Sequence, residues 1–236
     1  MMHPESKRTT GNEPEFPDKV NPDTALLIQK QMRHRCSIKR TIETDWIRLV
    51  CGADAAYTQD RIHAAVVVMT FPGLKFVERA CAVQNIPFPY IPGLLSFREG
   101  PAIIEAFSLL TTNPDLIFLN GHGYAHPRRC GIASHIGVLL NLPAIGVAQR
   151  LLTGTAAVPG EEPGSTVPVV DSGEVIGMAV RTKKGTKPVF VSAGHKIDLA
   201  QAVDVVLRTT TTHRFPEPLR AADRLSRECL QGRSGR

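Results

Sequence analysis

Three polar side chains of the chain suit metal-dependent chemistry. Asp54 follows Gly52 at the predicted end of a strand, and Glu99 lies beside the predicted start of a helix. Asn120 ends the apolar run 115–119. Polar functional groups gather at the carboxyl ends of strands in mixed sheets, and an Asp and a Glu that converge there can bind a hard divalent cation. The alternative is that Asp54 is a turn residue and Glu99 an acid favoured by the helix dipole.

A second candidate is the stiff stretch Pro89-Tyr90-Ile91-Pro92-Gly93. Its two prolines restrict the backbone, so the side chains between them are presented rather than flexible. A rigid exposed aromatic beside basic residues suits insertion between bases or stacking on one. The alternative is a proline-rich turn into a helix, with Tyr90 packed.

A third candidate segment continues directly from Asn120. It reads Gly121-His122-Gly123 and then His126-Pro127-Arg128-Arg129. A pair of arginines suits phosphate. The histidines of the segment, with His135, lack the spacing of a zinc site, because glycines and a proline interrupt the chain between them.

The elements that must position these residues predict an α/β fold. Three strand-like runs joined by short turns indicate an antiparallel meander, over 47–56, 62–71 and 74–83. Strands and helices then alternate, as strands 115–119 and 143–147 and helices 93–110 and 132–140. A hairpin (175–181 with 188–192) and two helices (198–211 and 218–230) end the pattern, and a helix capped by Asn21 or Asp23 begins it. We expect a mixed sheet with parallel strands after the meander and helices on both faces.

The segment 154–173 contains four glycines and three prolines, and is predicted to be a surface loop. Residues 1–21 are polar and rich in proline, which indicates a flexible lead-in. We expect 22–236 to form a single domain.

Composition limits the classes of function. The 236 residues carry 28 Lys and Arg against 22 Asp and Glu, a net charge of +6 that favours a polyanionic partner. No apolar run reaches the length of about 18 residues that a membrane helix needs, and the N-terminus lacks the apolar segment of a secretory signal. The five cysteines are scattered and odd in number, so we expect reduced thiols and a cytoplasmic location.

Taken in order, the motifs resemble the endonuclease V family. The resemblance is carried by 52–54, by 89–99 (PYIPGLLSFRE) and by 120–129 (NGHGYAHPRR), with 131–135, 145–148, 192–195 and 216–220 in support. It extends from about residue 22 to 230. It implies a ribonuclease H-like fold and a nuclease that uses Mg²⁺, or Mn²⁺ in its place. The implied substrate is DNA or single-stranded RNA that contains inosine (deaminated adenine), cut one nucleotide beyond the inosine on its 3′ side. The implied role is nucleic-acid repair by a monomer.

The resemblance also implies roles for individual residues. Asp54 and Glu99 match two acidic metal ligands, and the wedge that separates strands matches 89–92. The remaining predicted nucleic-acid contacts are Gly93, Gly121, His122, Gly123, His126 and Arg128.

Two positions depart from the family pattern. Asn120 stands where the family has the third acidic ligand, and Gln149 stands where it usually has lysine. Both belong to the predicted catalytic set. Asp223, also in the predicted catalytic set, falls where members of the family place a further polar residue of the metal site. The resemblance therefore implies that Asp223 partly compensates for the departures at Asn120 and Gln149. The alternative function is a weakened or inactive member that binds inosine-containing or branched nucleic acid.

Overall fold

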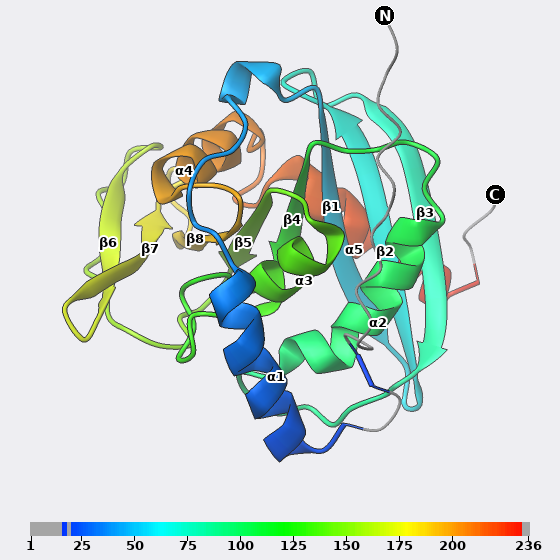
Figure 1. Cartoon of the computed structure of the whole chain (residues 1–236). Helices are drawn as coiled ribbons and strands as arrows, with labels where there is room; N and C mark the ends of the chain where they lie inside the picture. Colours follow the sequence, from blue (N-terminus) through cyan, green and yellow to red (C-terminus); the bar gives the residue numbers. More distant parts are fainter. Residues whose placement is uncertain (1–15, 18–19, 233–236) are drawn as a thin grey trace, which may run out of the picture.

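The computed structural model describes residues 16–17 and 20–232. Most of the predicted lead-in 1–21 lies outside the described residues. The described chain forms one eight-stranded sheet with helices against both faces (Figure 1).

The sheet has the strand order β3-β2-β1-β4-β5-β8-β7-β6. Its first three strands are the predicted antiparallel meander of β1 (Leu49–Tyr57), β2 (Arg61–Thr70) and β3 (Phe76–Asn85). Next, β4 (Leu116–Asn120) pairs in parallel with β1, and β5 (Ala144–Ala148) pairs in parallel with β4. The antiparallel strands β8 (Val189–His195), β7 (Glu174–Val180) and β6 (Thr166–Asp171) complete the sheet. The predicted order of an antiparallel meander followed by parallel strands is confirmed.

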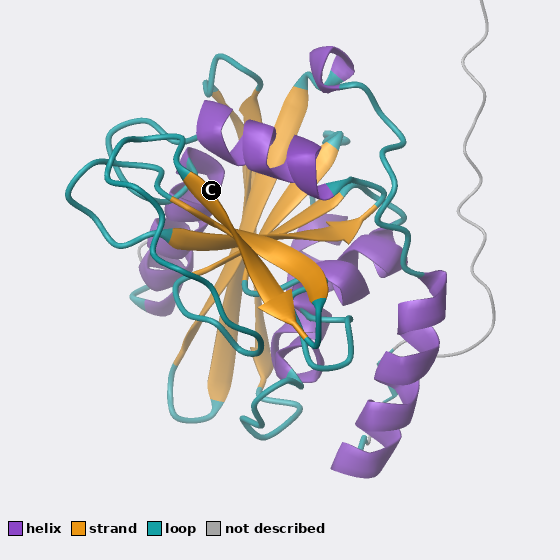
Figure 2. Cartoon of the chain, turned by 90° about the vertical axis from the view of Figure 1, so that its left-hand side faces the viewer, coloured by secondary structure: helices purple, strands orange, loops and turns teal. Residues whose placement is uncertain are grey.

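The helices form a layer on each side of the twisted sheet (Figure 2). One face is covered by α2 (Leu95–Ser108) and α3 (Ile132–Leu140), with α1 (Pro22–Arg35) packed outside α3. The other face is covered by α4 (Leu199–Arg208) and α5 (Glu217–Leu230). The predicted cap of the first helix is present, since Asn21 Oδ1 accepts from Thr24 N–H at 2.8 Å. No helix of the described residues is long and apolar enough to cross a membrane.

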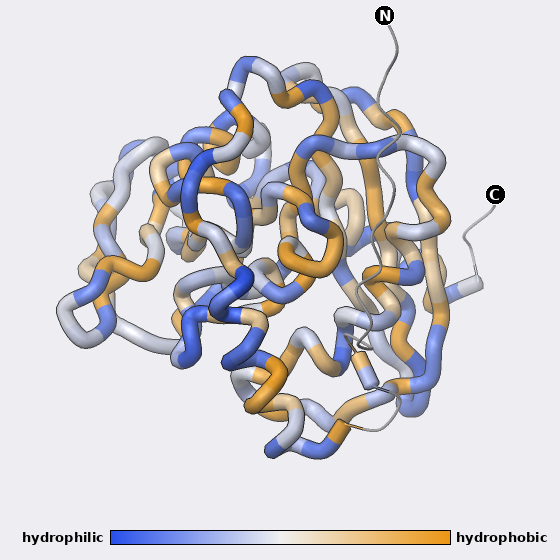
Figure 3. The backbone as a smooth tube through the Cα atoms, in the orientation of Figure 1, coloured by the Kyte–Doolittle hydropathy of each residue, from blue (hydrophilic) through white to orange (hydrophobic). Residues whose placement is uncertain are grey.

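Apolar side chains fill both interfaces between sheet and helices. Ile103 of α2 and Ile136 of α3 belong to the core on one face, and Val205 of α4 and Leu219 of α5 belong to the core on the other. The chain is correspondingly hydrophobic along the central strands and hydrophilic at many outer turns (Figure 3). The two layers hold the strand ends, and any groups that they carry, in fixed positions.

Gly52 lets α5 approach β1 closely. A Cβ atom on Gly52 would lie 2.2 Å from the backbone of Pro218, in the first turn of α5. Only a residue without a side chain permits this contact. The crossing brings the middle of α5 over the strand that carries Asp54.

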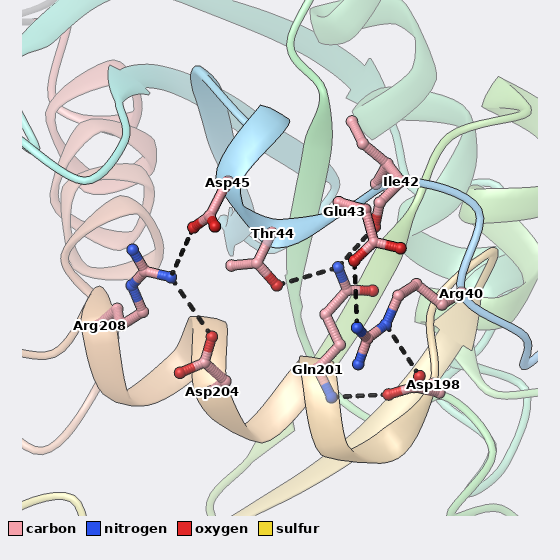
Figure 4. Close-up of polar contacts among 9 residues, drawn as sticks. All are labelled: Arg40, Ile42, Glu43, Thr44, Asp45, Asp198, Gln201, Asp204 and Arg208. Carbon is pink, nitrogen blue, oxygen red and sulfur yellow. Dashed lines mark hydrogen bonds and ion pairs between the residues drawn. The ribbon is translucent and has the colours of Figure 1, made fainter.

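The segment 40–45 is fixed against α4 by polar contacts (Figure 4). Gln201 Nε2 donates to the Ile42 carbonyl oxygen at 2.7 Å. Asp198 accepts from the Gln201 N–H at the start of α4 and pairs with Arg40 at 3.1 Å. This irregular stretch, including the short helix η1 (Thr44–Trp46), therefore has a defined path into β1.

One predicted loop is wrong in part, because 154–173 contains the strand β6. The strand lies at the edge of the sheet, where it pairs with β7 and forms an isolated bridge between Val170 and Thr155. Pro168 lies within it opposite Met178. An edge strand tolerates a proline, since one side of its backbone needs no partner in the sheet.

The expectation that all cysteines are reduced is also wrong. Cys81 of β3 and Cys229 of α5 form a disulfide. They are separated by 148 residues in the sequence, and they meet only because α5 packs across the meander. The other three cysteines are free and buried.

Candidate active site

Asp54 and Asn120 meet where β1 and β4 diverge. The parallel pairing of these strands ends at Ala53 and Leu119, one residue before each polar side chain. Asn120 Nδ2 donates to Asp54 Oδ1 at 3.3 Å. The prediction that Asp54 lies at the end of its strand is wrong, because β1 continues to pair with β2 as far as Tyr57. The sequence predicts that Asp54 and Glu99 converge; the contact between Asp54 and Asn120 was not predicted, and it arises where the β1–β4 pairing ends.

Glu99 approaches Asp54 from α2 and is 8% exposed. Tyr57 donates its hydroxyl to Glu99 Oε1 at 2.7 Å. The Arg98 guanidinium lies over the Tyr57 ring, 4.7 Å from its centroid, and donates to the Phe88 carbonyl oxygen. Tyr57 was not among the predicted site residues, because it lies three positions beyond Asp54 and points to the other face of the sheet.

Asp223 reaches the site from α5. It lines the same cavity as Asp54 and Asn120, and its carboxylate pairs with Arg227 at 2.6 Å. The structure therefore brings four of the predicted catalytic residues into one region, from β1, β4, α2 and α5.

The buried carboxyl groups repel one another when they ionise. Burial, and to a smaller extent the charge of Asp223, raise the pKa of Asp54 to about 7. Burial, and then the charge of Asp54, raise the pKa of Glu99 to about 8, although the hydrogen bond from Tyr57 opposes the change. A cation between these groups would relieve both effects.

The donor set fits a hard cation. Within the described part of the chain, no three His, Cys, Asp or Glu side chains gather closely enough to hold a metal by themselves. Mg²⁺ does not require such a cluster, because it keeps several waters and takes one or two carboxylates plus substrate phosphates. Asp54 and Glu99, with the amide oxygen of Asn120, supply oxygen ligands of this kind.

Asp54 and Asn120, but not Glu99, line a cavity of about 380 Å³, here called the carboxylate cavity. Its lining includes four of the predicted catalytic residues, Asp54, Asn120, Gln149 and Asp223. The rest of the lining is formed by Thr186, His213, Arg214, Phe215, Leu219, Arg220 and Arg227. The arginines among them were not predicted individually, since they come from a loop and a helix far from Asp54 in sequence.

A second cavity of about 290 Å³, here called the tyrosine cavity, lies beside the stretch 89–93. Its lining includes Tyr90, Ile91, Pro92, Gly93, Gly121, His122 and His126, with Arg150, Leu151 and Leu152. Tyr90 is 70% exposed, so the alternative of a packed tyrosine is wrong. Pro89 and Gly123 are not part of the lining; Gly123 is buried and donates to Ser192 Oγ at 2.9 Å.

The carbonyl oxygen of Gly93 fixes the position of the tyrosine stretch. It accepts from Gln29 Nε2 at 3.0 Å, from His126 Nε2 at 2.9 Å and from Arg128 at 3.0 Å. Gly93 has a φ of +83°, which favours glycine. His126 is buried and its pKa is lowered to about 4, chiefly by desolvation, so its neutral ring donates from Nε2 and accepts the Arg128 N–H at Nδ1.

Arg128 and Arg129 do not form the exposed phosphate-binding pair that the sequence predicts. Arg128 bonds to Gln29 and to Gly93. Arg129 forms ion pairs with Asp171 at 2.8 Å and with Glu174 at 2.7 Å. Both guanidinium groups therefore hold the segment 121–131 against neighbouring elements.

The two cavities adjoin at two strand ends. After β4, Asn120 lines the carboxylate cavity and Gly121 lines the tyrosine cavity. After β5, Gln149 lines the carboxylate cavity and Arg150 lines the tyrosine cavity. A ligand that occupies both would pass directly over these two pairs of residues.

The strand order 3-2-1-4-5, with carboxyl groups from β1, α2 and α5 and an amide at the end of β4, defines a ribonuclease H-like nuclease. A family model described as Endonuclease V matches residues 30–224. The chain belongs to the endonuclease V family, whose members are endonucleases, that is, phosphodiester hydrolases.

Individual relatives agree with the family. The chain is 51% identical over 180 residues to an endonuclease V of Roseiflexus sp. (strain RS-1), covering 76% of this chain and 81% of the relative. The crystal structure of an endonuclease V from Streptomyces avermitilis superposes with a TM-score of 0.87 at 40% identity, covering 93% and 97% of the two chains. A second structure, of Ciona intestinalis endonuclease V with a 24mer DNA that contains an inosine followed by a ribo-adenosine, has a TM-score of 0.76 at 29% identity, covering 86% and 95% of the two chains.

Proposed function

We propose that the protein is a Mg²⁺-dependent endonuclease that hydrolyses the phosphodiester bond one nucleotide 3′ to an inosine, in DNA or single-stranded RNA. The observation that supports this most directly is the division of consecutive residues between the two cavities. A base held in the tyrosine cavity leaves the adjoining backbone in the carboxylate cavity. Base recognition and hydrolysis then occur at neighbouring positions of one strand.

In this proposal Asp54, Glu99 and the amide oxygen of Asn120 hold the metal. When bound, Mg²⁺, or Mn²⁺ in its place, polarises the scissile phosphate and lowers the pKa of a water molecule. Tyr57 orients the Glu99 carboxylate through its hydroxyl. Asp223 lies near enough to Asp54 to raise its pKa, and it adds negative charge where Asn120 supplies none.

Tyr90, between Pro89 and Pro92, acts as the wedge in the proposal. Its exposure and the fixed position of Gly93 suit a side chain that inserts between bases. Inosine pairs poorly, so the cost of unstacking is least at the damaged site. The DNA complex of the Ciona relative supports DNA as one substrate. A role in nucleic-acid repair, a monomeric state and a cytoplasmic location are parts of the same proposal.

Asn120 and Gln149 favour a second candidate, a member that binds such nucleic acid but cuts slowly or not at all. The Asn120 amide nitrogen, not its oxygen, faces Asp54. The amide also supplies no negative charge to the metal site, where the carboxylate of an aspartate would supply one. Gln149, in the same cavity, supplies no cation to a phosphate oxygen.

Cleavage and binding assays on the same strands separate the two candidates. Inosine-containing DNA and RNA strands would be tested for nicking in Mg²⁺ and in Mn²⁺, and for gel shift in Ca²⁺. We expect metal-dependent nicking that Glu99→Gln abolishes. Glu105→Gln is the matched control, because Glu105 is an exposed acid of the same helix. Binding without nicking in either metal would support the second candidate, and unchanged nicking by Glu99→Gln would contradict the assigned site.

A further inference from the structure

Three guanidinium groups line the carboxylate cavity, and they differ in their partners. Arg220 pairs with Glu217 at 2.7 Å, and Arg227 pairs with Asp223 at 2.6 Å. Arg214 forms no ion pair with any residue that the structure describes; its guanidinium lies over the Phe215 ring, 5.3 Å from the centroid. Its charge is therefore not neutralised by the protein.

The backbone around Arg214 is fixed without the use of its side chain. Thr182 Oγ1 donates to the Arg214 carbonyl oxygen at 2.6 Å, and Lys183 Nζ donates to that of Thr212 at 2.5 Å. The turn that supplies these donors is held in place by Arg181, which donates to the carbonyl oxygens of Gly160 and Pro159. The loop thus presents a guanidinium from a rigid support.

We infer that Arg214 binds a backbone phosphate of the nucleic acid strand that occupies the carboxylate cavity. A guanidinium is suited to phosphate, because its donors match the oxygens in geometry and its charge persists at every relevant pH. The same cavity also holds the carboxylates of Asp54 and Asp223, which repel a phosphate. A strand that enters the cavity therefore needs a cation that the protein has not already neutralised. The inference rests on the proposed function, since it assumes that a strand enters this cavity.

The salt dependence of binding tests the inference. Each phosphate contact on a single strand contributes about 0.7 to the slope of log affinity against log salt concentration. Arg214→Gln should make this slope shallower by about 0.7. That change corresponds to about eightfold weaker binding at 50 mM salt and about threefold weaker binding at 200 mM. Arg214→Lys keeps the charge and should keep most of the slope.

Arg224→Gln is the matched control. Arg224 lies on α5 beside the cavity residues but does not line the cavity, and its side chain is 78% exposed. Both substitutions to glutamine remove one positive charge from the protein, so a difference between them isolates the cavity. Binding is measured in Ca²⁺ on a DNA strand with one inosine and on the same strand with guanine, after thermal melting has established that all three variants fold.

A salt slope that is shallower than that of the wild type in Arg214→Gln but not in Arg224→Gln, on both strands, supports the inference. Equal slopes for the two glutamine variants would overturn it. A slope in Arg214→Lys as shallow as that of Arg214→Gln would also overturn it. The proposed function is tested separately, by the preference of the wild-type protein for inosine. Equal binding of the inosine and guanine strands would contradict the proposed function. The inference about Arg214 would still be tested, because the salt slopes of the variants are also compared on the guanine strand.

Discussion

Replacing Glu99 with glutamine should stabilise the metal-free protein. The substitution keeps the shape of the side chain, and the new amide oxygen can still accept the Tyr57 hydroxyl that now lies 2.7 Å from Oε1. It removes a carboxyl group whose ionisation is opposed by burial and by Asp54. A buried carboxyl group that lowers the stability of the folded protein is typical of a functional residue, such as a metal ligand.

The sign and size of the effect follow from proton linkage. Folding raises the pKa of Glu99 from 4.5 to about 8, so the folded state binds this proton more tightly than the unfolded state. The stability that this provides is fully present below pH 4.5 and is lost as the pH rises to about 8. At pH 7 the loss amounts to about 3 kcal/mol. Glu99→Gln should recover it, which corresponds to a rise in Tm of about 6–12 °C for a chain of this size.

Thermal melting in a chelator at a series of pH values between 4.5 and 8.5 measures the effect. The wild-type Tm should fall with pH more steeply than that of Glu99→Gln, and the two should nearly coincide at pH 4.5. Glu105→Gln, an exposed acid of the same helix, should follow the wild type. Added Mg²⁺ should raise the Tm of the wild type more than that of Glu99→Gln. Equal pH profiles for wild type and Glu99→Gln would refute the reasoning.

Three further predictions concern the wedge tyrosine, the two positions that depart from the family pattern (Asn120 and Gln149) and the disulfide. Tyr90→Ala should reduce the preference for inosine over normal strands by about 1–3 kcal/mol in a gel-shift titration, with an unchanged Tm because the side chain is exposed; a large fall in Tm without a change in preference would contradict this. Asn120→Asp, alone or with Gln149→Lys, should increase nicking most at low Mg²⁺ and should change binding in Ca²⁺ much less; no gain in either variant would favour the binding candidate. Reduction of Cys81–Cys229, which closes a loop of 148 residues, should lower the unfolding free energy by up to about 5 kcal/mol; an unchanged denaturation midpoint in dithiothreitol would argue against this bond.

Local patterns predicted most of the elements. The helix 132–140 was predicted with the bounds that α3 has, because its apolar residues recur with helical spacing. The strand β6 was missed, because Pro168 and the glycines around it are typical of loops and only the position at the sheet edge makes a strand compatible with them.

The site was predictable where it depends on strand ends and unpredictable where it depends on packing. Asp54 and Asn120 were each singled out because they lie at predicted strand ends, and the structure brings them within hydrogen-bonding distance. Tyr57 and Arg214 carry no local signal, because each acquires its place only when α2 or the loop before α5 packs against the sheet. Arg128 carried a misleading signal, since a basic pair is common both in phosphate sites and in internal bonding of the kind observed.

The position of Asn120 explains how binding and cleavage can diverge within one fold. Its side chain belongs to the carboxylate cavity, whereas the next residue, Gly121, lines the tyrosine cavity. The Gly121 N–H donates to the Val147 carbonyl oxygen at 3.1 Å, and the path of the chain there is set by the backbone. In the proposed function, an asparagine in place of an aspartate here removes charge from the metal site without altering the shape of the tyrosine cavity. Cleavage and base recognition then depend on different side chains of the same strand ends, so that the proposed second candidate can lose cleavage and keep binding.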